Sequence, residues 1–346
     1  MNNKTKNGKI VYLEILRTVA LFFVLYAHSG DRGLMLYANT ATPVLRFVGI
    51  LLASFCELSV PVFFMISGAL LLKKEESLGR IWLHRVLPMS IITVLFAVFQ
   101  YVYLCIRHGV VFEAKQAFFF AYGGGSITQQ WFLYAYLSFL ILLPFLQRLA
   151  AKMKEEKWFY YLLGVKVFVS TLQLLLTSLF DMPAAGITIP FAETVIFYPL
   201  IGFYLANVLP DPEGKSRKCY FTAEILVPVV LIINTLMNLH SFGVDGSLAY
   251  SEWFLYVYAI GLFVFIRRIG NAKKSAPFWI FCGSGVFGTY LFETQLKDLV
   301  RLIPLGNPAG VTAGWLIEVG SILLVMALGF AVMFVVKKIP FVGKYL

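Results

Sequence analysis

The sequence predicts an all-α membrane protein, a polytopic bundle of about ten transmembrane helices with both termini in the cytoplasm. Apolar residues make up 60% of the 346 residues and charged residues only 14%, values that ordinary soluble domains do not show. The apolar residues form runs of about 20 residues, the length that a helix needs to cross a bilayer. Lysine and arginine gather between alternate runs, as they do in cytoplasmic loops.

The apolar runs identify the helices in chain order. The first run follows Lys4, Lys6 and Lys9 and contains Arg17, and no small-x-small cleavage site follows it. We therefore expect an uncleaved first helix and no signal peptide. Nine further runs follow, and the eighth of the ten helices is the shortest. The predicted helices cover residues 10–28, 47–72, 83–106, 130–149, 159–180, 191–209, 221–239, 251–266, 277–298 and 315–336.

Basic residues justify the order and orientation of these helices. They lie before the first helix, after the second, fourth, sixth, eighth and tenth, and these segments hold 21 of the 29 lysines and arginines. By the positive-inside rule these segments are cytoplasmic. The net charge of +11 therefore reports topology, and we expect no nucleic-acid partner. Ten helices with short loops use up the chain, so residues 1–346 should form a single membrane-embedded domain without a separate soluble domain.

Ionisable residues within the predicted helices are candidates for function, because burying them in a membrane is costly. Arg17 and His28 are eleven residues apart on the first helix. That spacing is close to three turns, so both lie on one face, about 16 Å apart along the axis. His28 thus combines a titratable side chain with a position far from the cytoplasmic end.

Several carboxylates reach a depth similar to that of His28, and one of them could fix its tautomer so that the other ring nitrogen acts as a general base. Glu57 is the expected partner, because the first and second helices are neighbours in sequence. Glu293 is the alternative. For Glu193 and Glu318 a position in the headgroup region is favoured. The cysteines (Cys56, Cys105, Cys219 and Cys282) form no CxxC pair or Cys/His cluster, so we expect no metal site and no redox role.

Five segments resemble the acyltransferase 3 family of bacterial membrane proteins, and the resemblance extends over nearly the whole chain. The most specific is the Arg-x10-His pattern of YLEILRTVALFFVLYAH, in which Arg17 and His28 stand. The others are VPVFFMISGALLL at 60–72, HRVLP at 84–88, QWFLYAYLSFLILLP at 130–144 and FGTYLFET at 287–294.

The resemblance implies a membrane-embedded acyltransferase of the bacterial inner membrane, with His28 as the catalytic histidine. It would move an acyl group, commonly acetyl, from cytoplasmic acyl-CoA to a hydroxyl of an envelope glycan or lipid-linked sugar, with no tightly bound cofactor. Arg17 and Arg85, with Arg80, would bind the acyl donor. The residues expected to line the substrate cavity are Ser67, Gln129, Trp131 and Tyr290.

The chain departs from the family pattern at three positions. The family often has two arginines three residues apart before the third helix, whereas here Trp82 stands three before Arg85 and the preceding arginine is Arg80. Gln129 and Glu293 stand where many members have histidine. The first departure concerns donor binding, and the other two concern the acceptor.

Two other classes of function are compatible with ten helices that carry buried charges. A transporter or flippase for an envelope glycan would show no dependence on acyl-CoA and would tolerate changes at His28. A scaffold or sensor would tolerate replacement of all intramembrane charges.

Overall fold

The computed structural model describes residues 10–123, 131–172, 175–176, 180, 189–210, 216–245, 254–270, 276–303 and 310–339. Within these ranges all regular elements are helices, as predicted. Four of them are long and apolar enough to cross a membrane, and they span Pro43–Leu71, Leu78–His108, Trp131–Lys152 and Val311–Val336. Shorter apolar helices occupy Thr194–Asn207 and Ile225–His240. The exact number of ten spans and the cytoplasmic termini stay predictions.

The helices follow the predicted order, with shifts of a few residues at their ends. The N-terminal half contains α1 (Val11–Ala27), α2 (Pro43–Cys56), α3 (Ser59–Leu71), α4 (Leu78–Ile81), a π-helical segment (Trp82–Val86), α5 (Leu87–His108), α6 (Ala114–Tyr122), α7 (Trp131–Lys152) and α8 (Glu156–Lys166). A second π-helical segment, Val167–Leu172, follows α8. The C-terminal half contains α10 (Thr194–Asn207), α11 (Ser216–Asp245), α12 (Leu255–Ile269), α13 (Ala276–Leu291), α14 (Glu293–Arg301) and α15 (Val311–Val336).

The predicted second helix, 47–72, is divided into α2 and α3. The division lies at Glu57 and Leu58, four and three residues before Pro61. A proline inside a helix cannot donate to the carbonyl four residues earlier, and its ring clashes with that carbonyl. Here that carbonyl belongs to Glu57, so Pro61 explains why the helix is interrupted at this residue.

The predicted ninth helix, 277–298, is also two helices, which meet at Phe292. The Phe292 ring packs edge-on against Phe96 of α5, with 5.0 Å between ring centroids. The composition changes at the same point, because α13 is apolar and α14, ETQLKDLVR, is amphipathic. One further correction concerns the predicted loop 107–129, which contains the helix α6.

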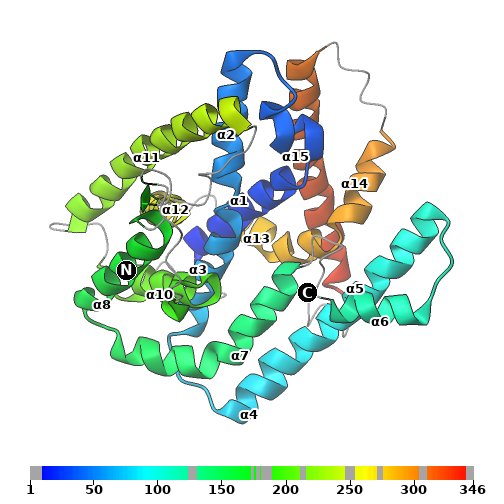
Figure 1. Cartoon of the computed structure of the whole chain (residues 1–346). Coiled ribbons are helices and arrows are strands. Elements are labelled where there is room, and N and C mark those ends of the chain that lie inside the picture. Colours follow the sequence, from blue (N-terminus) through cyan, green and yellow to red (C-terminus); the bar gives the residue numbers. More distant parts are fainter. Residues whose placement is uncertain are drawn as a thin grey trace.

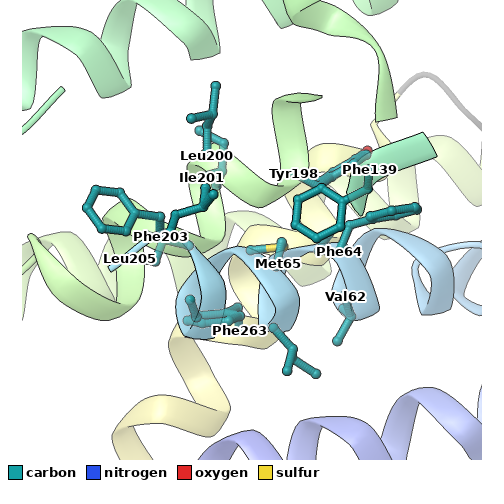
Figure 2. Close-up of a cluster of buried hydrophobic side chains, with 14 of the residues drawn as sticks. Val62, Phe64, Met65, Phe139, Tyr198, Leu200, Ile201, Phe203, Leu205 and Phe263 are labelled. Atoms are coloured by element: carbon teal, nitrogen blue, oxygen red, sulfur yellow. The ribbon is translucent and has the colours of Figure 1, made fainter. Parts of the chain in front are cut away.

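Helix α1 lies in the middle of the bundle, between α3 on one side and α13 and α15 on the other (Figure 1). Helices α3 and α10 pack closely against each other. A Cβ atom on Gly68 would lie 1.9 Å from the carbonyl oxygen of Pro199, and one on Gly202 would lie 2.1 Å from that of Met65. Both glycines therefore permit an approach that no other residue allows. Figure 2 shows the apolar side chains of α3 and α10 that pack around this crossing, with Phe139 and Phe263 beside them.

Candidate active site

A cavity of about 940 Å³ runs between α1, α3, α7 and α13. At one end it extends to the first π-helical segment, Trp82–Val86, called the π-helical segment below, and at the other end to the C-terminal end of α1. Its wall includes most of the residues that the sequence singled out. Those that line it are Arg17, His28, Glu57, Ser67, Arg85, Trp131 and Tyr290. These residues come from six separate segments of the chain, so the fold gathers them although the sequence spreads them over more than 270 positions.

His28 caps the C-terminal end of α1 and faces a carboxylate on α14. Its Nδ1 atom lies 3.0 Å from Oε1 and 3.0 Å from Oε2 of Glu293. The side chains are 19% and 4% exposed. A carboxylate accepts hydrogen bonds, so Nδ1 carries the proton and donates it, and the lone pair of Nε2 is left for a substrate proton. This is the arrangement of a general base with a fixed tautomer.

The carboxylate partner of His28 is thus Glu293, and the expectation that it would be Glu57 was wrong. Glu57 lies at the end of α2, where Pro61 interrupts the helix, and it lines the same cavity. It acts electrostatically on the hydroxyl groups of Tyr37 and Tyr258. Glu57 therefore belongs to the cavity wall at the end of α2.

A lysine that sequence reasoning assigned no role completes this cluster. The Nζ atom of Lys297 lies 2.6 Å from Oε1 of Glu293 and donates to the carbonyl oxygen of His28 at 3.0 Å and of Leu25 at 3.4 Å. Lys297 follows Glu293 by four residues on α14, so both side chains lie on one helix face. The four-residue spacing was visible in the sequence, but its relation to His28 was not.

Arg17 lines the cavity and is held by a second residue that the sequence analysis did not select. Its Nη1 atom donates to Oε1 of Glu14 at 2.8 Å, and Glu14 is only 3% exposed. Gly283 of α13 packs directly against Glu14, because a Cβ atom there would lie 2.2 Å from Oε2. The three-residue spacing of Glu14 and Arg17 on one helix was the available signal.

Arg85 reaches the cavity from the π-helical segment and is held at two points by Glu76. Its Nη2 atom lies 2.6 Å from Oε1 and its Nε atom 3.3 Å from Oε2. The hydrogen bond from Arg85 holds the pKa of the Glu76 carboxyl below its ordinary value. Arg80 does not line the cavity. Its side chain is 70% exposed, and its Nε atom lies 3.6 Å from Oε2 of Glu76.

One family of known proteins matches the chain. The model of an acyltransferase domain family, Acyl_transf_3, matches residues 10–337. The chain belongs to the acyltransferase 3 family. No curated protein and no solved structure gives a significant match. Together with the apolar helices, the family makes the chain a multi-pass membrane acyltransferase.

The residues that we expected to line the substrate cavity of this acyltransferase differ in their contacts and exposure. Tyr290 packs edge-on against Phe132 of α7, with 5.9 Å between ring centroids. Ser67 donates to the carbonyl oxygen of Phe63 at 2.9 Å and lies beside Tyr136. Trp131, at the start of α7, is 48% exposed. Gln129 lies outside the described residues.

Two further basic residues of the acyltransferase line the cavity and were given no role from the sequence. His84 precedes Arg85 in the π-helical segment, and Lys337 follows the last turn of α15. The Lys337 ammonium group bonds the carbonyl oxygen of Ser284. Both residues looked like ordinary loop charges in the sequence. Together with Arg17 and Arg85 they give one end of the cavity a positive lining, which we call the basic end. No group of three or more potential metal ligands occurs in the part of the chain that the structure describes.

Proposed function

We propose that this acyltransferase moves an acetyl group from cytoplasmic acetyl-CoA to a hydroxyl group of an envelope glycan or lipid-linked sugar, in the bacterial inner membrane. The observation that carries the proposal is the single cavity lined by Arg85 and Lys337 at one end and by His28 at the other. Such a cavity lets a donor held at the basic end meet an acceptor at a buried general base.

The basic end suits the phosphate groups of a coenzyme A donor. Guanidinium groups bind phosphate through paired hydrogen bonds, and lysine adds a point charge. In this proposal Arg85 and Lys337 hold the phosphates, and Arg17 lies further along the path of the thioester arm. Arg17 and His28 share the cavity-facing side of α1, about 16 Å apart along its axis, which suits an extended arm that reaches from the basic end to the imidazole.

The proposed chemistry uses His28 first as a base and then as an acid. Its Nε2 atom accepts the proton of the acceptor hydroxyl, the hydroxyl oxygen bonds to the thioester carbonyl carbon, and the carbon–sulfur bond breaks. The CoA thiolate then receives the proton from His28. The products are an acetyl ester and free CoA. Glu293 favours this exchange because it stabilises the imidazolium that forms between the two steps.

Glu57 and the aromatic wall suit a sugar-bearing acceptor. Glu57 is exposed within the cavity and can accept hydrogen bonds from hydroxyl groups. Phe132, Tyr136 and Tyr290 form apolar faces against which a sugar ring or a lipid tail can pack. A transporter would also need a passage, but it would not need a base with a fixed tautomer.

The test is the ester-linked acetyl content of the envelope in a deletion strain that carries plasmid copies of the gene. We expect His28→Ala to lose about 100-fold or more of the acetyl transfer, because general-base catalysis contributes roughly that much. His108→Ala is the matched control, since His108 is an exposed residue at the end of α5 and should retain full transfer. Normal acetyl content with His28→Ala at an equal protein level would refute the proposal.

A further inference from the structure

Lys297 is one of the few lysines of the described chain that is largely buried, with 15% of its side chain exposed. It donates to three acceptors at once, namely Glu293 and the last carbonyl groups of α1 at Leu25 and His28. A helix leaves its final carbonyl groups without partners inside the helix. Lys297 therefore joins the end of α1, which carries His28, to the start of α14, which carries Glu293.

Helix α14 is held in place by contacts on its other side, so this junction has a rigid base. Asp298 accepts from the Tyr103 hydroxyl at 2.7 Å and pairs with Arg107 at 2.9 Å, both on α5. Gln295 donates to Gln100, also on α5, at 2.9 Å. The residue before Asp298 is Lys297, and its Nζ atom reaches α1 instead.

We propose that Lys297 is a positioning residue of the acyl-transfer site. It keeps Glu293 ionised and aimed at His28, and it weakens the binding of a proton by the His28–Glu293 pair. This inference rests on the proposed function only for its link to catalysis. The charge argument itself concerns the three side chains and can be tested without acyl transfer.

The sign of the effect follows from charge balance. With neutral His28, the negative charge of Glu293 is balanced by Lys297, and a proton on the pair leaves the cluster with a net positive charge. Without Lys297, the same proton neutralises an uncompensated buried carboxylate and is held more tightly. The two groups titrate together, so the result is the same whether the proton resides on the imidazole or on the carboxylate. Removal of Lys297 should therefore raise the pH at which the His28–Glu293 pair takes up its proton and His28 stops being a free base.

Other charged and titratable groups lie on the elements that surround this cluster. Tyr290 of α13 interacts electrostatically with Glu293. The other such groups on the adjoining elements are Asp31 and Arg32 after α1, Glu57 at the end of α2, Arg107 on α5, Asp298 on α14 and Glu318 on α15. All of them are retained in every variant compared here. Their contribution is therefore common to all the pH profiles and cancels in the comparison.

The direct test measures the reactivity of the His28 imidazole in the purified full-length protein. Diethyl pyrocarbonate modifies neutral imidazole, and mass spectrometry of the peptide that contains His28 gives the rate at each pH. We expect Lys297→Gln and Lys297→Met to move the half-maximal rate upward by about one pH unit or more. Lys297→Arg, which keeps the charge, should stay close to wild type. Arg301→Gln is the matched control, because it removes an exposed cation of α14 that pairs with Asp298.

Transfer of radiolabel from acetyl-CoA to envelope material, followed over the same pH range in membranes, should show the same upward movement of its acid limb in Lys297→Gln. An unchanged midpoint in both neutral variants, with His28 still reactive, would overturn the inference about Lys297. Absence of label transfer by the wild-type protein would refute the proposed function instead, and the reactivity measurement would still decide the role of Lys297.

Discussion

At the scale of single residues, Glu76 and Arg85 make the best-defined ion pair at the basic end, and its pH dependence is predictable. The pKa of Glu76 is lowered by the hydrogen bond from Arg85, so the pair stabilises the fold above the ordinary glutamate pKa of about 4.3. This stabilisation is lost as the pH falls through the lowered value and Glu76 takes up a proton.

We expect Glu76→Gln to lower the free energy of unfolding by about 1.5–3 kcal/mol at pH 7, the range for a hydrogen bond to a charged group. The difference from wild type should shrink only below about pH 4. Thermal unfolding in detergent at several pH values measures it. Glu155→Gln is the control, because Glu155 and Lys157 are both 65% exposed and such pairs contribute little. Equal stability of Glu76→Gln and wild type at pH 7 would contradict this account.

His28 shows how far single residues can be understood from the sequence. Its helix face, its depth and its need for a carboxylate follow from spacing and from the cost of burying charge. The choice of Glu293 does not, because 265 positions separate the two residues and their contact depends on how α1 packs against α13 and α14. Lys297 stands four residues after Glu293 in the sequence, but the carbonyl groups that it caps become its partners only in the folded chain.

At the scale of helices, close packing of α3 against α10 supports the wall of the cavity, since Ser67 of α3 precedes Gly68 at the crossing. A methyl group on Gly202 would meet the Met65 carbonyl at 2.1 Å, so the two helices would have to separate. We expect Gly202→Ala to destabilise the protein by about 1–3 kcal/mol, as overpacked cores do.

The matched control for Gly202→Ala is Gly320→Ala on α15, where a new Cβ atom would have nothing within 4 Å. Alanine is the better helix former by about 1 kcal/mol, so this control should unfold at the same temperature as wild type or higher. Thermal unfolding of both purified variants in detergent provides the comparison. A Gly202→Ala protein as stable as Gly320→Ala would show that the crossing is looser than described.

The helix boundaries were largely predictable, and the two interruptions show where prediction ends. Pro61 is visible in the sequence, and a proline inside an apolar run is a signal for a kink such as the one between α2 and α3. The interruption at Phe292 has no proline or glycine beside it. Its signal was the change from apolar α13 to amphipathic α14, which a search for 20-residue apolar runs passes over. This matters for the site, because both Glu57 and Glu293 stand at these interruptions.

At the scale of the whole molecule, composition and the alternation of basic loops were enough to predict a helical membrane protein. These features are averages over many residues and tolerate local errors. The cavity could not be predicted in this way, because it is the space left between helices that are distant in sequence. Its basic end joins the π-helical segment to the end of α15, some 250 residues later.

In the proposed function, a donor enters at the basic end of this cavity and its acyl group is transferred at His28. Inside-out and right-side-out membrane vesicles from cells that make the full-length protein test it, with radiolabelled acetyl-CoA added outside the vesicles. We expect non-protein envelope material to become labelled only in inside-out vesicles, and we expect His28→Ala to abolish the labelling. Equal labelling in both orientations, or labelling that persists without His28, would contradict it.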